Sequence, residues 1–64
     1  MKRYRLINEF KSYERGTKFY VVAESEFIGV KEYVLRTRDL KRRLIITEVE
    51  LNRNFLRIYD EHLW

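Results

Sequence analysis

The sequence predicts an all-β domain, a small five-stranded barrel with one short helical turn before the last strand. Several segments alternate polar and apolar residues or are rich in β-branched and aromatic residues, as strands are. Ten of the 64 residues are aromatic, and such large side chains let a small core exclude water. At this length residues 1–64 form one domain.

Composition excludes several classes of protein. Cysteine is absent, so neither disulfides nor thiolate metal sites support the fold. Residues 1–10 contain no apolar run of signal-peptide length. The longest apolar run, Phe19–Ala23, is far short of the roughly 20 residues that span a bilayer. We therefore expect a cytoplasmic protein that does not associate with membranes.

The first predicted strand is Lys2–Ile7, where basic and apolar residues alternate. A period of two places Tyr4 and Leu6 on one face and Arg3 and Arg5 on the other. We therefore expect a strand that is buried on one side only.

A polar loop, Asn8–Arg15, follows and ends at Gly16, which suits a positive φ. The next strand, Lys18–Glu24, is apolar on both faces and therefore lies centrally in the sheet. Its predicted faces are Phe19, Val21 and Ala23 on one side and Tyr20 and Val22 on the other. Residues 25–30 are expected to form a connection around Gly29, with Phe27 and Ile28 folding back over the core.

Two strands, Lys31–Arg38 and Arg42–Thr47, flank a predicted turn at Asp39-Leu40. A two-residue loop fixes the register; a longer loop is the alternative, because Asp-Leu is not a favoured turn pair. The pairs expected on one side are Leu35 with Leu44 and Tyr33 with Ile46, and on the other Val34 with Ile45, Arg36 with Arg43, and Arg38 with Lys41.

The C-terminal quarter allows two interpretations. Thr47 and Glu50 fit a capping box that starts a helix. The helix is either one turn followed by a last strand over Phe55–Tyr59, or a long amphipathic helix packed on an antiparallel sheet, an α+β fold. Asn52 and Asn54 are poor helix formers and favour the short turn. Residues 61–64 would then extend beyond the last strand without packing.

This order of elements resembles that of SH3-like small barrels, in particular short SH3-like proteins of bacteriophages and prophages. The segments that carry the resemblance are Gly16–Val22, Tyr33–Arg36, Leu44–Leu51 and Asn54-Phe55. The resemblance implies a five-stranded barrel and covers residues 2–59. The chain lacks the aromatic cluster and the tryptophan of a proline-binding SH3 groove, so binding of proline-rich peptides is not implied.

Catalytic and metal-binding chemistry have few candidates. His62 is the only histidine, and a surface position is its simplest interpretation. The Glu24/Glu26 and Glu48/Glu50 pairs suit a solvated face or the start of a helix. The two glycines are too far apart for a phosphate-binding loop. We therefore expect no enzymatic activity, metal, cofactor or small-molecule substrate.

Residues 36–43 contain five basic groups and one acid. Like charges opposite one another destabilise a sheet, and a bound polyanion would offset that repulsion. Nearby Asp39, Glu32 or Glu48 could also neutralise the group, or the charges could discourage aggregation at an edge. Tyr4, Tyr13 and Tyr20 are expected in the core. The candidate site residues are Arg36, Arg38, Lys41, Arg42 and Arg43, extended by Arg3 and Arg5.

The functional hypothesis is a non-enzymatic module that binds the nucleic-acid backbone through this basic hairpin, because no base-reading motif is present. The alternatives are a protein-interaction module or inhibitor that docks on an acidic partner surface, and a structural component of a virion or complex.

Overall fold

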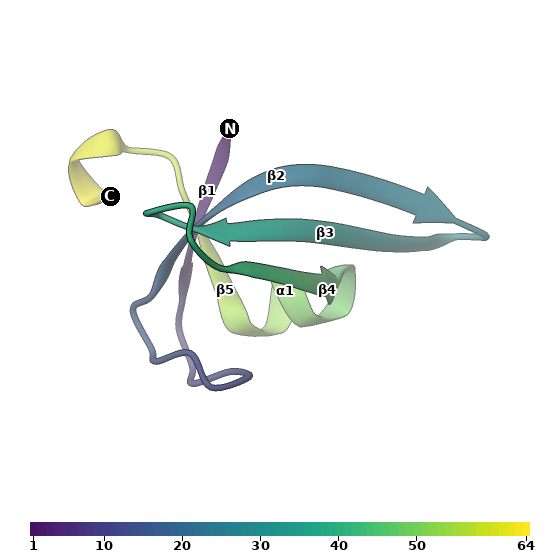
Figure 1. Cartoon of the computed structure of the whole chain (residues 1–64), viewed down its shortest axis with the longest axis horizontal. Coiled ribbons are helices and arrows are strands. Elements are labelled where there is room, and N and C mark those ends of the chain that lie inside the picture. The colour runs from purple at the N-terminus through teal and green to yellow at the C-terminus, as the bar shows by residue number, and fades with distance from the viewer.

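The computed structural model describes the backbone of residues 1–64 and every side chain except that of Glu61. Five antiparallel strands form one sheet in the order β4-β3-β2-β1-β5, and one short helix joins the two edge strands (Figure 1). The elements are β1 (Lys2–Leu6), β2 (Lys18–Phe27), β3 (Val30–Thr37), β4 (Arg43–Thr47), α1 (Glu48–Asn54), β5 (Phe55–Ile58) and a 3₁₀ helix (Glu61–Leu63).

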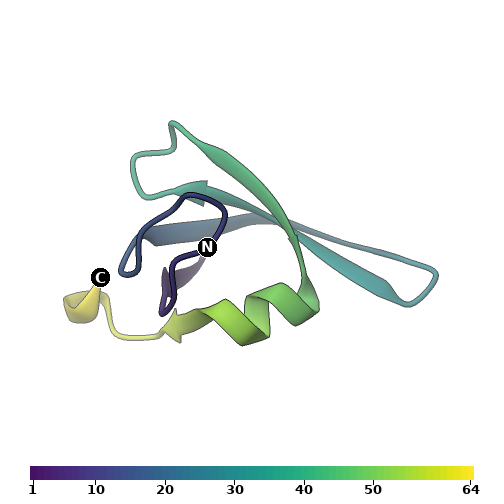
Figure 2. The same ribbon diagram turned by 90° about the horizontal axis from the view of Figure 1, so that it is seen from below.

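The predominance of β-structure and the central position of β2 are confirmed. Strands β1 to β4 form a meander, and α1 then carries the chain to the opposite edge, where β5 pairs with β1 (Figure 2). The predicted barrel is not confirmed, because β4 and β5 are the two edges of the sheet and do not pair with each other.

The core lies on one face of the sheet and is built around aromatic rings. Phe55 makes edge-to-face contacts with Tyr4, Phe10 and Phe19 at centroid distances of 6.4, 5.9 and 5.6 Å. This geometry is the one that ring quadrupoles prefer. The buried core residues are Leu6, Tyr13, Phe19, Val21, Tyr33, Leu35, Ile46, Leu51 and Phe55.

Strand β2 is longer than predicted and changes face halfway along. Val21 pairs with Leu35, but Ala23 pairs with Val34, so a bulge lies between them. The extra residue reverses the alternation. Ala23, predicted on the core face, is therefore exposed.

Residues 25–30 do not form the predicted connection over the core. Phe27 pairs with Val30 across the two-residue turn Ile28-Gly29, so β2 and β3 make one long hairpin. Phe27 and Ile28 are 77% and 84% exposed, and the prediction that they cover the core is wrong. The prediction assumed that large apolar side chains beside a turn are buried, and Phe27 and Ile28 do not follow that tendency.

The register of β3 and β4 is the expected one. Tyr33 pairs with Ile46, and Arg36 with Arg43. The connection is the longer alternative, because β3 ends at Thr37 and β4 begins only at Arg43. The expected pair of Arg38 with Lys41 is therefore not part of the ladder.

The C-terminal quarter follows the short-helix interpretation, and the long helix is wrong. Thr47 caps α1, and the reciprocal bonds between Thr47 and Glu50 complete the predicted capping box. The helix ends where Phe55 adopts an extended backbone, with φ −124°. Its side chain is 5% exposed, so burial of this ring in the core opposes continuation of the helix.

The last residues pack on the sheet, contrary to the prediction that they extend beyond it. The 3₁₀ helix turns the chain back, and the Trp64 ring lies 5.1 Å from that of Tyr20. The Trp64 indole N–H also donates to the Tyr20 hydroxyl oxygen at 3.3 Å. The segment thus covers part of the sheet face opposite the core.

Candidate polyanion-binding face

A row of basic residues crosses the sheet on the face opposite the core. Arg3 on β1 pairs with Tyr20 on β2, and Tyr20 pairs with Arg36 on β3. Arg36 in turn pairs with Arg43 on β4. Side chains of directly paired residues share one face of a sheet. Three arginines and one tyrosine therefore lie side by side across four strands.

A second basic row lies one step along the strands. Arg5 on β1 pairs with Lys18 on β2. The backbone N–H of Arg38 donates to the Lys18 carbonyl oxygen at 3.0 Å, which continues the row to the end of β3. We call the two rows together the basic face: Arg3, Arg5, Lys18, Tyr20, Arg36, Arg38 and Arg43.

Two cations of the second row converge on one oxygen atom. The Lys18 ammonium and the Arg38 guanidinium donate to the main-chain oxygen of Trp64, at 2.8 and 2.9 Å. Charge-assisted bonds of this length are stronger than neutral ones. The pair is therefore positioned to hold a single acceptor oxygen between them.

The first row combines charge with an aromatic surface. Tyr20 is half-buried on the basic face, and Trp64 packs against its ring at a 58° angle. The prediction that Tyr20 belongs to the core is wrong, whereas Tyr13 is buried as expected. Aromatic rings beside arginines provide the stacking and phosphate contacts that single-stranded nucleic acids use.

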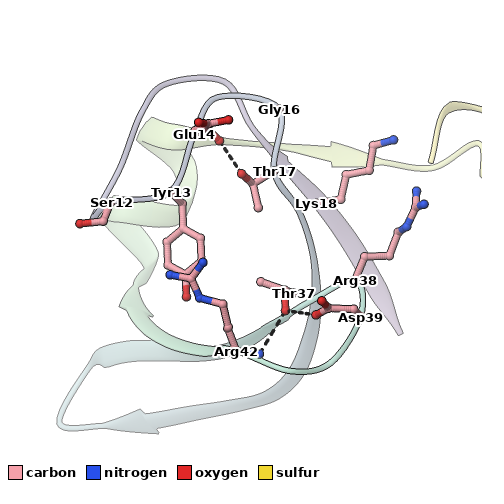
Figure 3. A pocket seen from close by; sticks show the side chains of 10 residues that line it. All are labelled: Ser12, Tyr13, Glu14, Gly16, Thr17, Lys18, Thr37, Arg38, Asp39 and Arg42. Atoms are coloured by element: carbon pink, nitrogen blue, oxygen red, sulfur yellow. Dashed lines mark hydrogen bonds between the residues drawn. The ribbon is translucent and has the colours of Figure 1, made fainter.

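The remaining hairpin cations point elsewhere. Arg42 stacks on the Tyr13 ring, with its guanidinium carbon 4.3 Å from the centroid. Together with Lys18 and Arg38 it borders an open hollow of about 650 Å³ between the β1–β2 loop and the β3–β4 turn (Figure 3). Lys41 is exposed at that turn. The candidate residues thus divide between the basic face, the hollow and the turn.

Acidic residues do not neutralise the hairpin through ion pairs. Among the described side chains, the ion pairs are Lys2 with Glu24 and Lys11 with Glu50. Arg36 instead donates to the Leu40 carbonyl oxygen at 3.1 Å. Among the side chains that the structure describes, no carboxylate therefore forms an ion pair with a hairpin cation, although the charge of Lys41 contributes to lowering the pKa of Asp39.

The one acid within the hairpin serves the turn. The Asp39 carboxylate accepts from the Thr37 hydroxyl at 2.6 Å and from the Lys41 backbone N–H at 3.0 Å. These two hydrogen bonds, chiefly that from Thr37, lower the pKa of Asp39. Bonds to the charged form favour ionisation. Asp39 thus fixes the turn geometry that positions its basic neighbours.

Two members of the arrangement were missed by sequence reasoning. Lys18 shares the alternation of β2 with Tyr20, so its place on the face opposite Phe19 could have been read from the sequence. Trp64 gave no comparable signal, because its position depends on a turn after β5 that has no distinctive residues. No sequence pattern therefore indicates that the Trp64 ring packs against Tyr20.

Catalytic features are sparse in the part of the chain that the structure describes. No cluster of three His, Cys, Asp or Glu side chains there could hold a metal ion. His62 is exposed, and its backbone N–H donates to the Asp60 carboxylate. Within the same residues, no helix has the length and apolarity that a bilayer crossing requires.

Comparison with protein-family models, with curated proteins and with solved structures finds no significant match to this chain.

Proposed function

We propose that this domain is a non-enzymatic binding module that contacts the nucleic-acid backbone through the basic face. The observation that carries the proposal is the cross-strand row in which Arg3 and Arg36 flank Tyr20 and Arg43 follows. The second row doubles the number of cations on the same face.

The dimensions of the face suit a polyphosphate chain. Neighbouring strands are about 4.8 Å apart, so a row across four strands extends about 14 Å. The two rows together present six cations, which is enough for contacts with about four phosphates. Contacts of this kind are insensitive to base sequence.

We further propose that the fold is SH3-like. The meander of β1 to β4, the pairing of β5 with β1 and the helix just before β5 support this assignment. The long loop between β1 and β2 also matches the SH3-like order, in which a long loop follows the first strand. The proposal concerns the architecture alone, since fold does not determine function.

An acidic protein surface is the second candidate ligand. The main-chain oxygen of Trp64 sits between Lys18 and Arg38, which favours a polypeptide ligand at that position. A protein partner would bind saturably and leave generic nucleic acid unbound. A measurement of oligonucleotide binding therefore distinguishes the nucleic-acid ligand from the protein ligand.

The test compares two double charge reversals by fluorescence anisotropy with labelled single- and double-stranded oligonucleotides. Arg36→Glu with Arg43→Glu should abolish binding, because it inverts the centre of the row. The control, Lys31→Glu with Arg53→Glu, changes net charge equally at exposed positions outside the basic face and should retain binding. With about four phosphates neutralised, log affinity should fall with log salt with a slope of about −3 to −4.

Thermal melts show whether the variants are folded. The Arg36/Arg43 variant should melt close to the parent temperature, because one like-charged cross-strand pair is replaced by another of opposite sign. A parent protein that binds neither oligonucleotide at low salt would refute the nucleic-acid proposal. Equal loss of binding in the control would show that only net charge matters.

A further inference from the structure

The β2–β3 hairpin projects from the body of the molecule and ends in an apolar tip. Figure 1 shows the two strands running well past α1 and the other strands. Beyond Val21 β2 has no pairing with β1, and β3 pairs with β4 only as far as Glu32. The tip residues Phe27, Ile28 and Val30 are 77%, 84% and 55% exposed. This is a large apolar surface for so small a chain.

The turn at the tip is held in an unfavourable backbone conformation. Ile28 has φ 51°, followed by Gly29 at 75°. A β-branched residue in the left-handed region is a true outlier, and such turns strongly favour Asn-Gly. Ile28 therefore destabilises the monomer twice, through its backbone and through its exposure. A contact outside the monomer would account for both.

The stem below the tip is acidic, whereas the opposite end of the molecule is basic. Residues 24–32 contain Glu24, Glu26 and Glu32 against Lys31, and Glu24 is paired with Lys2. The β3–β4 turn, which borders the hollow, lies toward the other end of the long axis, along which the molecule extends 36 Å (Figure 1). The hollow is lined by Lys18, Arg38 and Arg42 against Glu14 and Asp39. Its net charge is therefore opposite in sign to that of the stem, and one surface is convex where the other is hollowed.

We propose that the apolar tip of one copy inserts into the hollow of a second copy. The stem glutamates then face Lys18, Arg38 and Arg42, which border the hollow. Stacking of Arg42 on the buried Tyr13 ring holds the Arg42 guanidinium at the hollow. The hollow is open on one side and has a volume of about 650 Å³, so it can receive the side chains of one turn.

The position of the two surfaces determines the kind of assembly. Tip and hollow are different patches near opposite ends of the molecule, so the contact is head-to-tail and adds further copies in a filament or a closed ring. A symmetric dimer through the free edges of β2 around Ser25 would instead place Glu24 opposite Glu26 of the other copy. Like charges directly opposite destabilise such pairing. The same glutamates disfavour insertion of the tip into anionic membranes or nucleic acid.

Sedimentation velocity over a concentration series tests the self-association. The mass should rise continuously above 8.0 kDa in low salt and fall as salt is added. Ile28→Asn should abolish the rise and increase the melting temperature of the monomer. The control Val49→Ser removes another exposed apolar side chain, 62% exposed on α1, and should associate like the parent. A parent that remains at 8.0 kDa throughout refutes the proposal.

A mixing experiment distinguishes head-to-tail contact from tip-to-tip contact. Ile28→Asn retains the hollow, and Arg38→Glu with Arg42→Glu retains the tip; each should be monomeric alone. Together they should form a complex of two chains and nothing larger, because each supplies one intact surface. No complex from the mixture, with both variants folded by thermal melt, would refute insertion of the tip into the hollow. Loss of association in Val49→Ser would also refute it.

Discussion

The two hairpins of this sheet share strand β3 and differ in almost every other respect. The β3–β4 turn is polar and basic, and side-chain bonds tie it to the body. The β2–β3 hairpin is apolar at its tip, acidic along its stem, and has no contact of its turn with the rest of the chain among the described interactions. The comparison shows that a single strand can contribute to the core at one end and to an exposed surface at the other.

Anchoring of the β3–β4 turn is mostly local. Thr37 is 8% exposed; its hydroxyl donates to Asp39 and accepts from the Arg42 backbone N–H at 3.2 Å. Nothing equivalent exists at Ile28-Gly29, where the backbone conformation is strained. The turn at the basic end is therefore held by side-chain hydrogen bonds, while the apolar end depends on the intrinsic stability of a two-stranded ribbon, which is marginal in water.

The largest contrast is expected from truncations at the two ends of β3. Leu35 is fully buried and Val30 is 55% exposed. Leu35→Ala should lower the free energy of unfolding by about 2–5 kcal/mol, as core truncations do, which is a large part of the stability of a small domain. Val30→Ala should change it by less than about 0.5 kcal/mol. Urea unfolding measures both; similar losses in the two variants would show that the ribbon packs on the body.

A smaller loss is expected from Thr37→Val, which keeps the side-chain shape and removes the hydroxyl. The Arg42 N–H loses its side-chain acceptor and Asp39 loses its donor, so the cost should be about 1–3 kcal/mol. The Asp39 pKa should also rise toward its ordinary value, because the Thr37 bond is the main cause of its depression. Urea unfolding and an NMR titration measure the two effects. An unchanged Asp39 pKa would mean that Thr37 does not position this carboxylate.

The start of α1 is a second local anchor and should respond to pH. The Thr47 backbone N–H donates to the Glu50 carboxylate at 3.0 Å, and this bond is the main reason that the Glu50 pKa is lowered. A depressed folded-state pKa contributes stability above the unfolded-state value of 4.5, and that contribution is lost as pH falls through the folded pKa. Glu50→Gln should therefore reduce the stability difference between pH 6 and pH 3. If the free energy of unfolding changes equally with pH in the parent and in Glu50→Gln, this account is contradicted.

The capping interaction itself should be worth about 1 kcal/mol, which Thr47→Ala measures at pH 7. This cost is smaller than that expected at Thr37 because the N-terminus of α1 is more exposed to water. A helix N-cap that costs nothing to remove would indicate that packing of Leu51 alone fixes the helix.

Much of this fold was predictable from the sequence because it depends on local patterns. Alternation placed Leu6, Val21 and Ile46 in the core, and cross-strand counting gave the register of Arg36 with Arg43. The start of α1 followed from Thr47 and Glu50. Each of these features rests on neighbouring residues or on a single pairing.

The errors arose where distant contacts or an unusual backbone decided the outcome. The bulge that exposes Ala23 has no glycine or other marker. The tip at Ile28 contradicts ordinary turn chemistry, so residue preferences pointed to a different structure. The packing of Trp64 on Tyr20 joins residues 44 positions apart. Alternation could suggest that Lys18 and Tyr20 share a face of β2, but only the register shows that they stand beside Arg5, Arg3 and Arg36.

The smallest effect, and the one of opposite sign, is expected at the turns themselves. Ile28→Asn should raise the free energy of unfolding by about 0.5–1 kcal/mol, because asparagine tolerates the left-handed region that a β-branched residue resists. Leu40 provides the comparison in the other hairpin, since it also has a positive φ of 64° and is 48% exposed. Leu40→Asn should stabilise the domain less than Ile28→Asn does. Leucine is not branched at Cβ, so it resists the left-handed region less than isoleucine does. Urea unfolding at concentrations where the parent is monomeric measures both changes. A loss of stability in Ile28→Asn would show that the Ile28 side chain already has a favourable contact within the monomer, and the contrast between the two hairpins would then be wrong.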